Sequence, residues 1–78
     1  MPEGLQAAFG LAVRDLRRAR GWSQEHLAEL AGLDRTYVSG LERGKRNPAL
    51  STQERLARAL GSDLASILRT AESASSAE

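Results

Sequence analysis

The side chains that could do chemistry in this sequence are mainly hydrogen-bond donors repeated at helical spacing. Arg35, Thr36, Ser39 and Arg43 follow one another at intervals of one, three and four residues. At about 100° per residue, they fall on the side of a helix opposite Val38. Arginine, threonine and serine can hydrogen-bond to phosphates and to the polar edges of bases. The spacing therefore indicates a helix whose polar side can face a nucleic-acid groove.

Catalytic chemistry has little support in the composition. The chain has no cysteine, which excludes disulfides and thiolate zinc sites, and its one histidine, His26, cannot form a metal cluster alone. We find no paired carboxylates, no nucleophile–base set and no phosphate-binding glycine loop. We therefore expect no enzymatic activity, no metal and no cofactor, and we expect His26 to face solvent.

Length and charge limit the class of protein further. The chain has 78 residues, 41% of them hydrophobic, and a net charge of only +1, but its basic residues cluster at 14–20 and 35–46. A basic stripe on a near-neutral domain is typical of nucleic-acid binding. No apolar run approaches the length of a membrane span, and residues 1–11 lack the pattern of a signal peptide. We expect a cytoplasmic protein with no membrane partner.

The apolar pattern predicts an all-α domain of five helices, at about residues 5–19, 24–31, 35–43, 50–60 and from 64 onward. The first helix carries one apolar stripe, made of Leu5, Phe9, Ala12, Val13 and Leu16. The fourth uses Leu50, Leu56, Ala57 and Leu60, and the fifth, with Asp63 as its cap, uses Leu64, Ile67 and Leu68. We expect residues 1–69 to form the domain and residues 70–78, rich in Ser, Ala and Glu, to be a flexible tail.

Local signals mark the ends of the second and third helices. Ser23 can cap the second helix, with Trp22 and Leu27 at the spacing of a hydrophobic staple, and Gly32 can end it. We expect Leu27, Ala28, Leu30 and Ala31 to form its buried side. Asp34 is the expected cap of the third helix, which Gly44 follows in a left-handed conformation. Val38 and Leu41 would point into the core.

These residues carry a family pattern. Gln24, Ala28, Gly32, Val38 and Leu41 stand at the spacing of the phage-repressor-like helix-turn-helix family, also called the XRE family. The chain resembles that family from residue 16 to residue 68, including Glu-Arg-Gly-Lys-Arg-Asn-Pro at 42–48 and Leu-Ala-Arg-Ala-Leu-Gly at 56–61. Residues 34–47 look most like the controller proteins of restriction–modification systems, which are small dimers that regulate their own operon and the endonuclease gene. Two positions that are usually apolar in the family hold Gln53 and Ser62 here.

The resemblance implies a role for each polar residue. Arg35, Thr36 and Ser39 are expected to contact bases of double-stranded DNA from the major groove. Contacts to the DNA backbone, or mixed contacts, are expected from Ser23, Gln24, Tyr37, Arg43, Lys45, Arg46 and Asn47. Tyr37 could equally be a ring at the edge of the core, and residues 45–47 could be an ordinary solvated loop. Arg17 and Glu42 are expected to form an ion pair between the first and third helices.

Two further expectations concern the binding face and the assembly. Gly40, in the interior of the third helix, is expected to let that helix approach DNA closely. A homodimer is expected because so small a core cannot cover all the apolar residues, with Leu64, Ile67 and Leu68 at its interface. We expect a sequence-specific transcriptional regulator that binds a pseudo-palindromic operator, with no small-molecule ligand. The alternative is an antitoxin or another protein-interaction module that uses the helix-turn-helix as a scaffold.

Overall fold

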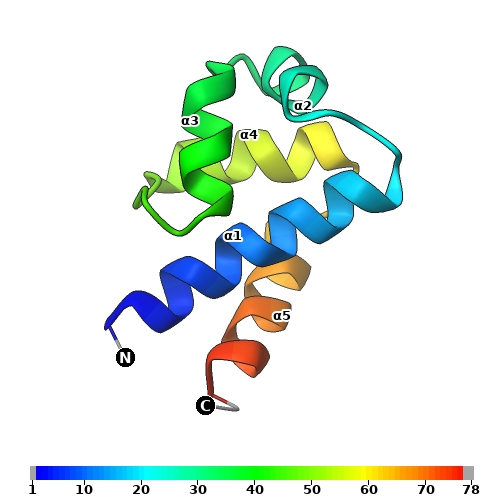
Figure 1. Cartoon of the computed structure of the whole chain (residues 1–78). Coiled ribbons are helices and arrows are strands. Elements are labelled where there is room, and N and C mark those ends of the chain that lie inside the picture. Colours follow the sequence, from blue (N-terminus) through cyan, green and yellow to red (C-terminus); the bar gives the residue numbers. More distant parts are fainter. Residues whose placement is uncertain (1, 77–78) are drawn as a thin grey trace.

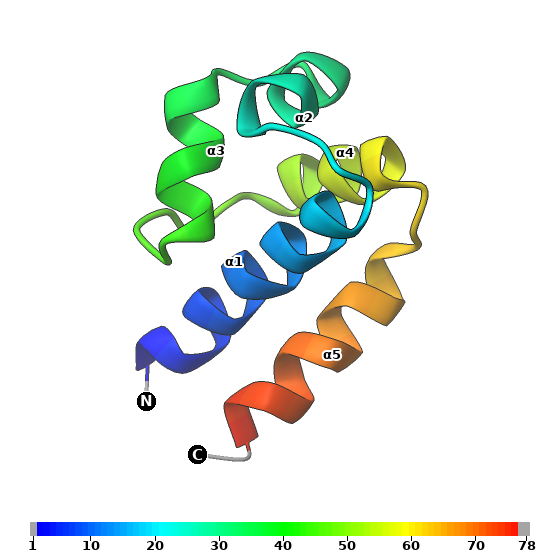
Figure 2. The same cartoon turned by 45° about the vertical axis from the view of Figure 1, so that its right-hand side comes forward.

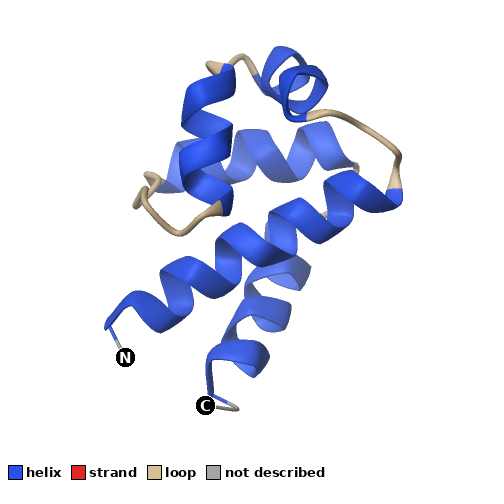
Figure 3. Ribbon diagram, in the orientation of Figure 1, coloured by secondary structure: helices blue, strands red, loops and turns tan. Residues whose placement is uncertain are grey.

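The computed structural model describes residues 2–76, and every regular element in that range is a helix (Figure 3). The five helices are α1 (Pro2–Ala19), α2 (Gln24–Ala31), α3 (Arg35–Glu42), α4 (Leu50–Leu60) and α5 (Leu64–Ser76). The all-α prediction is confirmed, and the predicted bounds of α2 and α4 are reproduced.

The helices form two groups. In Figure 1, α2 and α3 lie together at one end of the molecule, with α4 beside them, and α1 crosses below. In Figure 2, α1 and α5 lie side by side, and both chain ends are at the free ends of these two helices. The arrangement leaves α3 on the outside of the bundle, supported from behind by α1 and α2.

The core is built from the apolar stripes expected for α1, α3 and α4. Its largest fully buried side chains are Leu27, Leu41, Leu56, Leu60, Val13 and Val38. Three predictions about burial were wrong: Leu5 is 43% exposed, Leu30 is 50% exposed and Leu50 is 67% exposed. Leu30 lies beside the buried arc of α2 formed by Leu27 and Ala31, and Leu50 lies in the first turn of α4.

The caps explain where α2 and α5 begin and where α2 ends. Ser23 Oγ accepts a hydrogen bond from the backbone N–H of His26 at 3.0 Å, and Gly32 ends α2 with φ of +69°. Asp63 Oδ1 accepts one from the N–H of Ser66 at 2.8 Å. Hydrogen bonds from Ser66 lower the pKa of the Asp63 carboxyl below its ordinary value. Asp34 precedes α3 as expected, but its side chain makes no capping hydrogen bond.

The predicted tail is the main correction to the domain boundaries. Residues 70–76 continue α5 as regular helix instead of forming a flexible segment. Ala71, which follows Ile67 by one helical turn, is completely buried in the core. One small side chain of this segment therefore packs in the core, although the composition of the segment suggests disorder. Residues 77 and 78 of the expected tail lie outside the described range.

Candidate nucleic-acid interface

The outer side of α3 carries the polar residues that its spacing predicted. Arg35 and Thr36 are exposed in its first turn, and Ser39 is half-buried one turn later. Arg43 follows at the C-terminal end, where its Nη1 donates a hydrogen bond to Ser39 Oγ at 2.8 Å. On this side of α3, Arg35 and Thr36 are thus the exposed side chains whose donors are not already used by Ser39 and Arg43.

A buried ion pair fixes α3 against α1. Arg17 Nε lies 2.7 Å from Glu42 Oε2, and Arg17 Nη2 lies 2.9 Å from Glu42 Oε1. Both residues are buried, and hydrogen bonding to the carboxylate raises the pKa of the Arg17 guanidinium above its ordinary value. Arg17 Nη1 also donates to the carbonyl of Trp22 at 2.7 Å. The pair expected from the family resemblance is therefore present, and Arg17 adds no free charge to the surface.

Gln24 takes part in the same network. Its Nε2 donates a hydrogen bond to Glu42 Oε1 at 3.0 Å, which sequence reasoning did not foresee. The bond uses one of the two hydrogens on Nε2 and leaves the other available to an acceptor such as phosphate. The first residue of α2 and the last residue of α3 are thereby held together.

The loop after α3 turns back toward that helix. Lys45 donates its backbone N–H to the carbonyl of Gly40 at 2.8 Å, directly after Gly44 at φ of +75°. Lys45, Arg46 and Asn47 are all exposed. Positive charge therefore lies next to the outer side of α3.

Tyr37 lies at the edge of the core, which was one of its two expected positions, whereas Gly40 differs from expectation in what covers it. The Arg46 guanidinium carbon lies 5.3 Å from the centre of the half-buried Tyr37 ring. Gly40 was placed on an open outer face, but it is buried, and a Cβ there would lie 3.3 Å from Cγ and Nε of Arg46. That space is filled by an arginine of the same chain, so Gly40 does not simply leave α3 open to DNA.

Arg55 is a second residue whose structural role the sequence did not indicate. Its Nε donates to the carbonyl of Ala31 at 3.1 Å, and its Nη2 donates to that of Gly32 at 2.6 Å. These carbonyls end α2, where no helical N–H follows to bond them. Arg55 therefore ties the end of α2 to α4.

The expected dimer residues divide into two kinds. Ile67 is only 3% exposed, because its side chain is part of the core of the single chain. It cannot supply an exposed dimer contact, which corrects the prediction for that residue. Leu64 and Leu68 are partly buried and pack against the same core.

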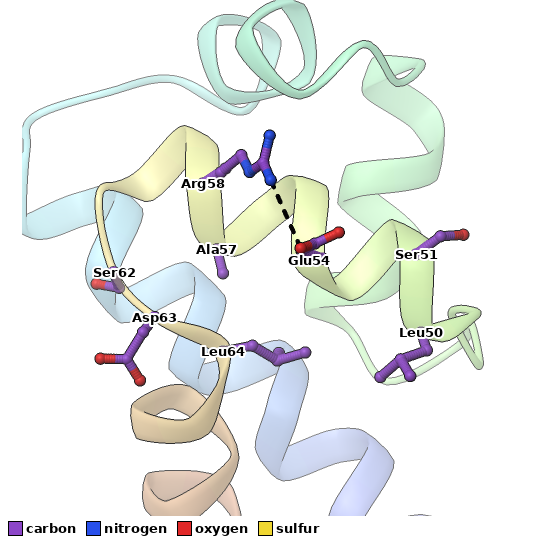
Figure 4. Close-up of a pocket in the computed structure, with 8 residues that line it drawn as sticks. All are labelled: Leu50, Ser51, Glu54, Ala57, Arg58, Ser62, Asp63 and Leu64. Atoms are coloured by element: carbon purple, nitrogen blue, oxygen red, sulfur yellow. Dashed lines mark ion pairs between the residues drawn. The ribbon is translucent and has the colours of Figure 1, made fainter.

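An apolar hollow opens where α4 and α5 meet. It has a volume of about 750 Å³, and its lining includes Leu50, Ala57 and Leu64 (Figure 4). Glu54 and Arg58 of α4 also line it and form an ion pair of 3.6 Å (Figure 4). Ser62, one of the two departures from the family pattern, also lines the hollow, whereas Gln53 donates to the carbonyl of Pro48 at 3.1 Å. The apolar surface available to a partner thus centres on Leu50 and Leu64.

No group of three or more His, Cys, Asp or Glu side chains in residues 2–76 is placed to hold a metal ion. In the same range, none of the helices combines the length and apolar character needed to cross a membrane. His26 is exposed, with its ring 4.9 Å from that of Trp22 in an edge-on arrangement.

A helix-turn-helix family model matches residues 13–67, which is more than two thirds of the chain and includes the whole α2–α3 unit. The chain belongs to the helix-turn-helix family. It is a DNA-binding regulator of this type, similar to the controller proteins of restriction–modification systems. The relatives described below are regulators of transcription or of restriction–modification systems, and the comparisons do not favour the antitoxin alternative.

Three relatives illustrate the similarity. A hypothetical transcription factor of Neisseria meningitidis is 51% identical over 59 residues, which cover 76% of this chain but only 56% of that protein. The crystal structure of the controller protein C.AhdI from Aeromonas hydrophila is 48% identical, with a TM-score of 0.78 over 80% of this chain and 94% of that one. The controller protein C.Esp1396I, solved as a tetramer on its natural 35 base-pair operator, is 28% identical, with a TM-score of 0.82 over 91% and 93%.

Proposed function

We propose that this chain is a dimeric, sequence-specific transcriptional regulator that binds a pseudo-palindromic operator with α3 in the major groove. The observation that carries the proposal is the position of Arg35 and Thr36, which are exposed in the first turn of α3. In helix-turn-helix proteins, it is the N-terminal residues of the second helix of the motif that contact base edges. The buried Arg17–Glu42 pair holds α3 in place from behind.

We assign the surrounding polar residues to the DNA backbone. Ser23 and Gln24 stand at the N-terminal end of α2, where free N–H groups and the helix dipole favour a phosphate. Arg43, Lys45 and Asn47 are exposed at the other end of α3. Together these groups would place positive charge and donors on both sides of Arg35 and Thr36, which is how phosphate contacts set the register of such a helix on DNA.

We assign dimerisation to the hollow between α4 and α5. Among the described residues, Leu50 is the most exposed large apolar residue, and it lines this hollow with Leu64. Two copies joined there would present two α3 helices to successive major grooves about 34 Å apart. A regulator of this kind would act in the cytoplasm, without a small-molecule ligand.

We further propose that the chain is a restriction–modification controller. The support is the 48% identity to C.AhdI over most of both chains and the similarity to C.Esp1396I bound to its operator. In such a system, regulation would depend on protein concentration and on the occupancy of neighbouring operator sites by pairs of dimers.

In-vitro selection of DNA from a random pool tests the proposal. The wild-type chain should enrich two inverted half-sites whose centres lie about one helical turn apart. Binding to the enriched duplex should weaken steeply as salt rises, because phosphate contacts release counterions. A pool that remains random after repeated rounds, at salt low enough to retain any DNA, would refute the proposed function.

A further inference from the structure

Gly40 stands in the interior of α3, where glycine has poor helix propensity and no positive φ requires it. It follows Thr36 by four residues, so the two share one strip of the helix surface. Gly40 is nevertheless buried. The group that covers it therefore lies on the same side of α3 as the proposed base contacts.

That group is the side chain of Arg46. A Cβ built at Gly40 would lie 3.3 Å from both Cγ and Nε of Arg46, which is closer than these atoms ordinarily approach. The apolar part of the arginine thus lies directly over the backbone of α3, and a Cβ at position 40 would require Arg46 to shift by a few tenths of an ångström. Long arginine side chains commonly cover an apolar surface in this way and keep the charged end in water.

The charged end is held by Tyr37. The guanidinium carbon lies 5.3 Å from the centre of the tyrosine ring, within the range of a cation–π contact. Among the described residues, the Arg46 guanidinium makes no hydrogen bond, so its donors remain available. The bond from the Lys45 N–H to the Gly40 carbonyl brings the loop back to this position.

We propose that Tyr37 and Gly40 form a seat that holds Arg46 across α3 as a further specificity-determining side chain beside Arg35 and Thr36. The inference rests on the proposed function and deepens it. An arginine already ordered in its binding position loses less conformational freedom when it meets DNA. Its planar guanidinium can pair with the two acceptors of a guanine edge. A cation on an unordered loop would not distinguish guanine from the other bases in this way. Tyr37 and Gly40 act as positioning residues.

The first test uses the free protein, so it does not depend on DNA binding. The Nε–H resonance of Arg46 is measured by NMR in the wild type, in Gly40→Ala and in Tyr37→Leu. The tyrosine ring should shift this resonance away from that of a solvated arginine in the wild type, and both variants should move it back toward that value. An Arg46 resonance that is identical in all three proteins overturns the seat.

The second test is a double-mutant cycle on the selected operator. Gly40→Ala should weaken binding by about tenfold when Arg46 is present, and by less than about twofold when Arg46 is replaced by alanine. The melting temperature of Gly40→Ala should not fall, because alanine favours the helix. Equal losses in both backgrounds, or no loss in either, contradict the proposal.

The lysine variant separates specificity from charge. Arg46→Lys keeps the positive charge but not the planar donor pair, so it should retain the salt dependence of binding and lose the preference at one base pair in each half-site. Unchanged base preference would overturn the role assigned to Arg46. Failure of the wild type to select any sequence would instead count against the proposed function, while the NMR result would still decide whether the seat exists.

Discussion

Glu42 accepts two hydrogen bonds from Arg17, at 2.7 and 2.9 Å, at the point where α1 passes the end of α3. The carboxylate also accepts one from Gln24 at 3.0 Å, so Arg17 of α1 compensates its charge and residues of two other helices bond to it. This single contact fixes the direction of α3 relative to α1 and α2. It connects a buried part of the core to the surface that we assign to DNA.

Removal of either partner should destabilise the fold strongly. Glu42→Ala leaves the Arg17 guanidinium buried without its carboxylate, and we expect a loss of about 3–5 kcal/mol in the free energy of unfolding. Chemical denaturation of the two single variants and the double variant Arg17→Met/Glu42→Ala measures the coupling. The partly exposed pair Arg14–Asp15 on α1, at 3.9 Å, is the control, with an expected coupling below about 0.5 kcal/mol. Equal coupling in the two pairs would show that the buried pair has no special role.

Gly10 should be among the least replaceable residues of α1. A Cβ at this position would collide with the backbone carbonyl oxygen of Leu41, which cannot move without shifting α3. We expect Gly10→Ala to cost at least about 3 kcal/mol, despite the better helix propensity of alanine. Gly21→Ala is the control, because nothing lies within 4 Å of its Cβ and only its φ of +70° is unfavourable, at about 1–2 kcal/mol. Thermal unfolding that ranks Gly21→Ala as the more damaging change would contradict this packing.

Arg55 should contribute more to stability than its exposure indicates. Its two hydrogen bonds satisfy the carbonyls of Ala31 and Gly32 at the end of α2. We therefore expect Arg55→Ala to lower the free energy of unfolding by about 1–2 kcal/mol. Arg18→Ala removes an equally long cation from an exposed position on α1 and should cost less than about 0.5 kcal/mol. Urea denaturation of the two variants provides the comparison, and equal midpoints would exclude a capping role for Arg55.

Leu50 should control dimerisation. If the hollow between α4 and α5 is the interface, Leu50→Asp places an unpaired charge in it, and the dimer dissociation constant should rise by at least about tenfold. Leu30→Asp, at a leucine that is 50% exposed and does not line the hollow, should leave the dissociation constant unchanged. Sedimentation equilibrium measures both. A wild-type chain that remains monomeric at high micromolar concentration, or an effect of Leu30 as large as that of Leu50, would contradict the assignment.

The sequence predicted the features that depend on local signals. Ser23, Gly32 and Asp63 mark helix ends through their own backbone and side-chain chemistry, and each does so in the structure. Val38 and Leu41 were placed in the core by periodicity alone, and they are 0% and 1% exposed. The Arg17–Glu42 contact was expected only because the family pattern supplied it, since the two residues are 25 positions apart.

The features that were missed depend on which elements lie beside one another. Residues 70–76 look disordered by composition, but the packing of α1 against α5 favours a small buried residue such as Ala71. Gly40 appeared to lie on an open face because no local signal shows that the loop returns Arg46 over it. Ile67 was assigned to a dimer interface because periodicity shows only which side of the helix is apolar. Its place in the core of the single chain depends on how the helices pack together.

Selection of DNA with Arg35→Ala, beside the wild type, decides whether α3 determines the operator sequence. Arg35 is exposed in the first turn of α3, and Arg69→Ala, at an exposed arginine of α5, is the control. We predict that Arg35→Ala loses the preference at one base pair in each half-site and binds the wild-type operator about 5–100-fold more weakly, while Arg69→Ala returns the wild-type sequence. If Arg35→Ala selects the same operator with the same base preferences as the wild type, α3 does not determine the sequence and the account is wrong.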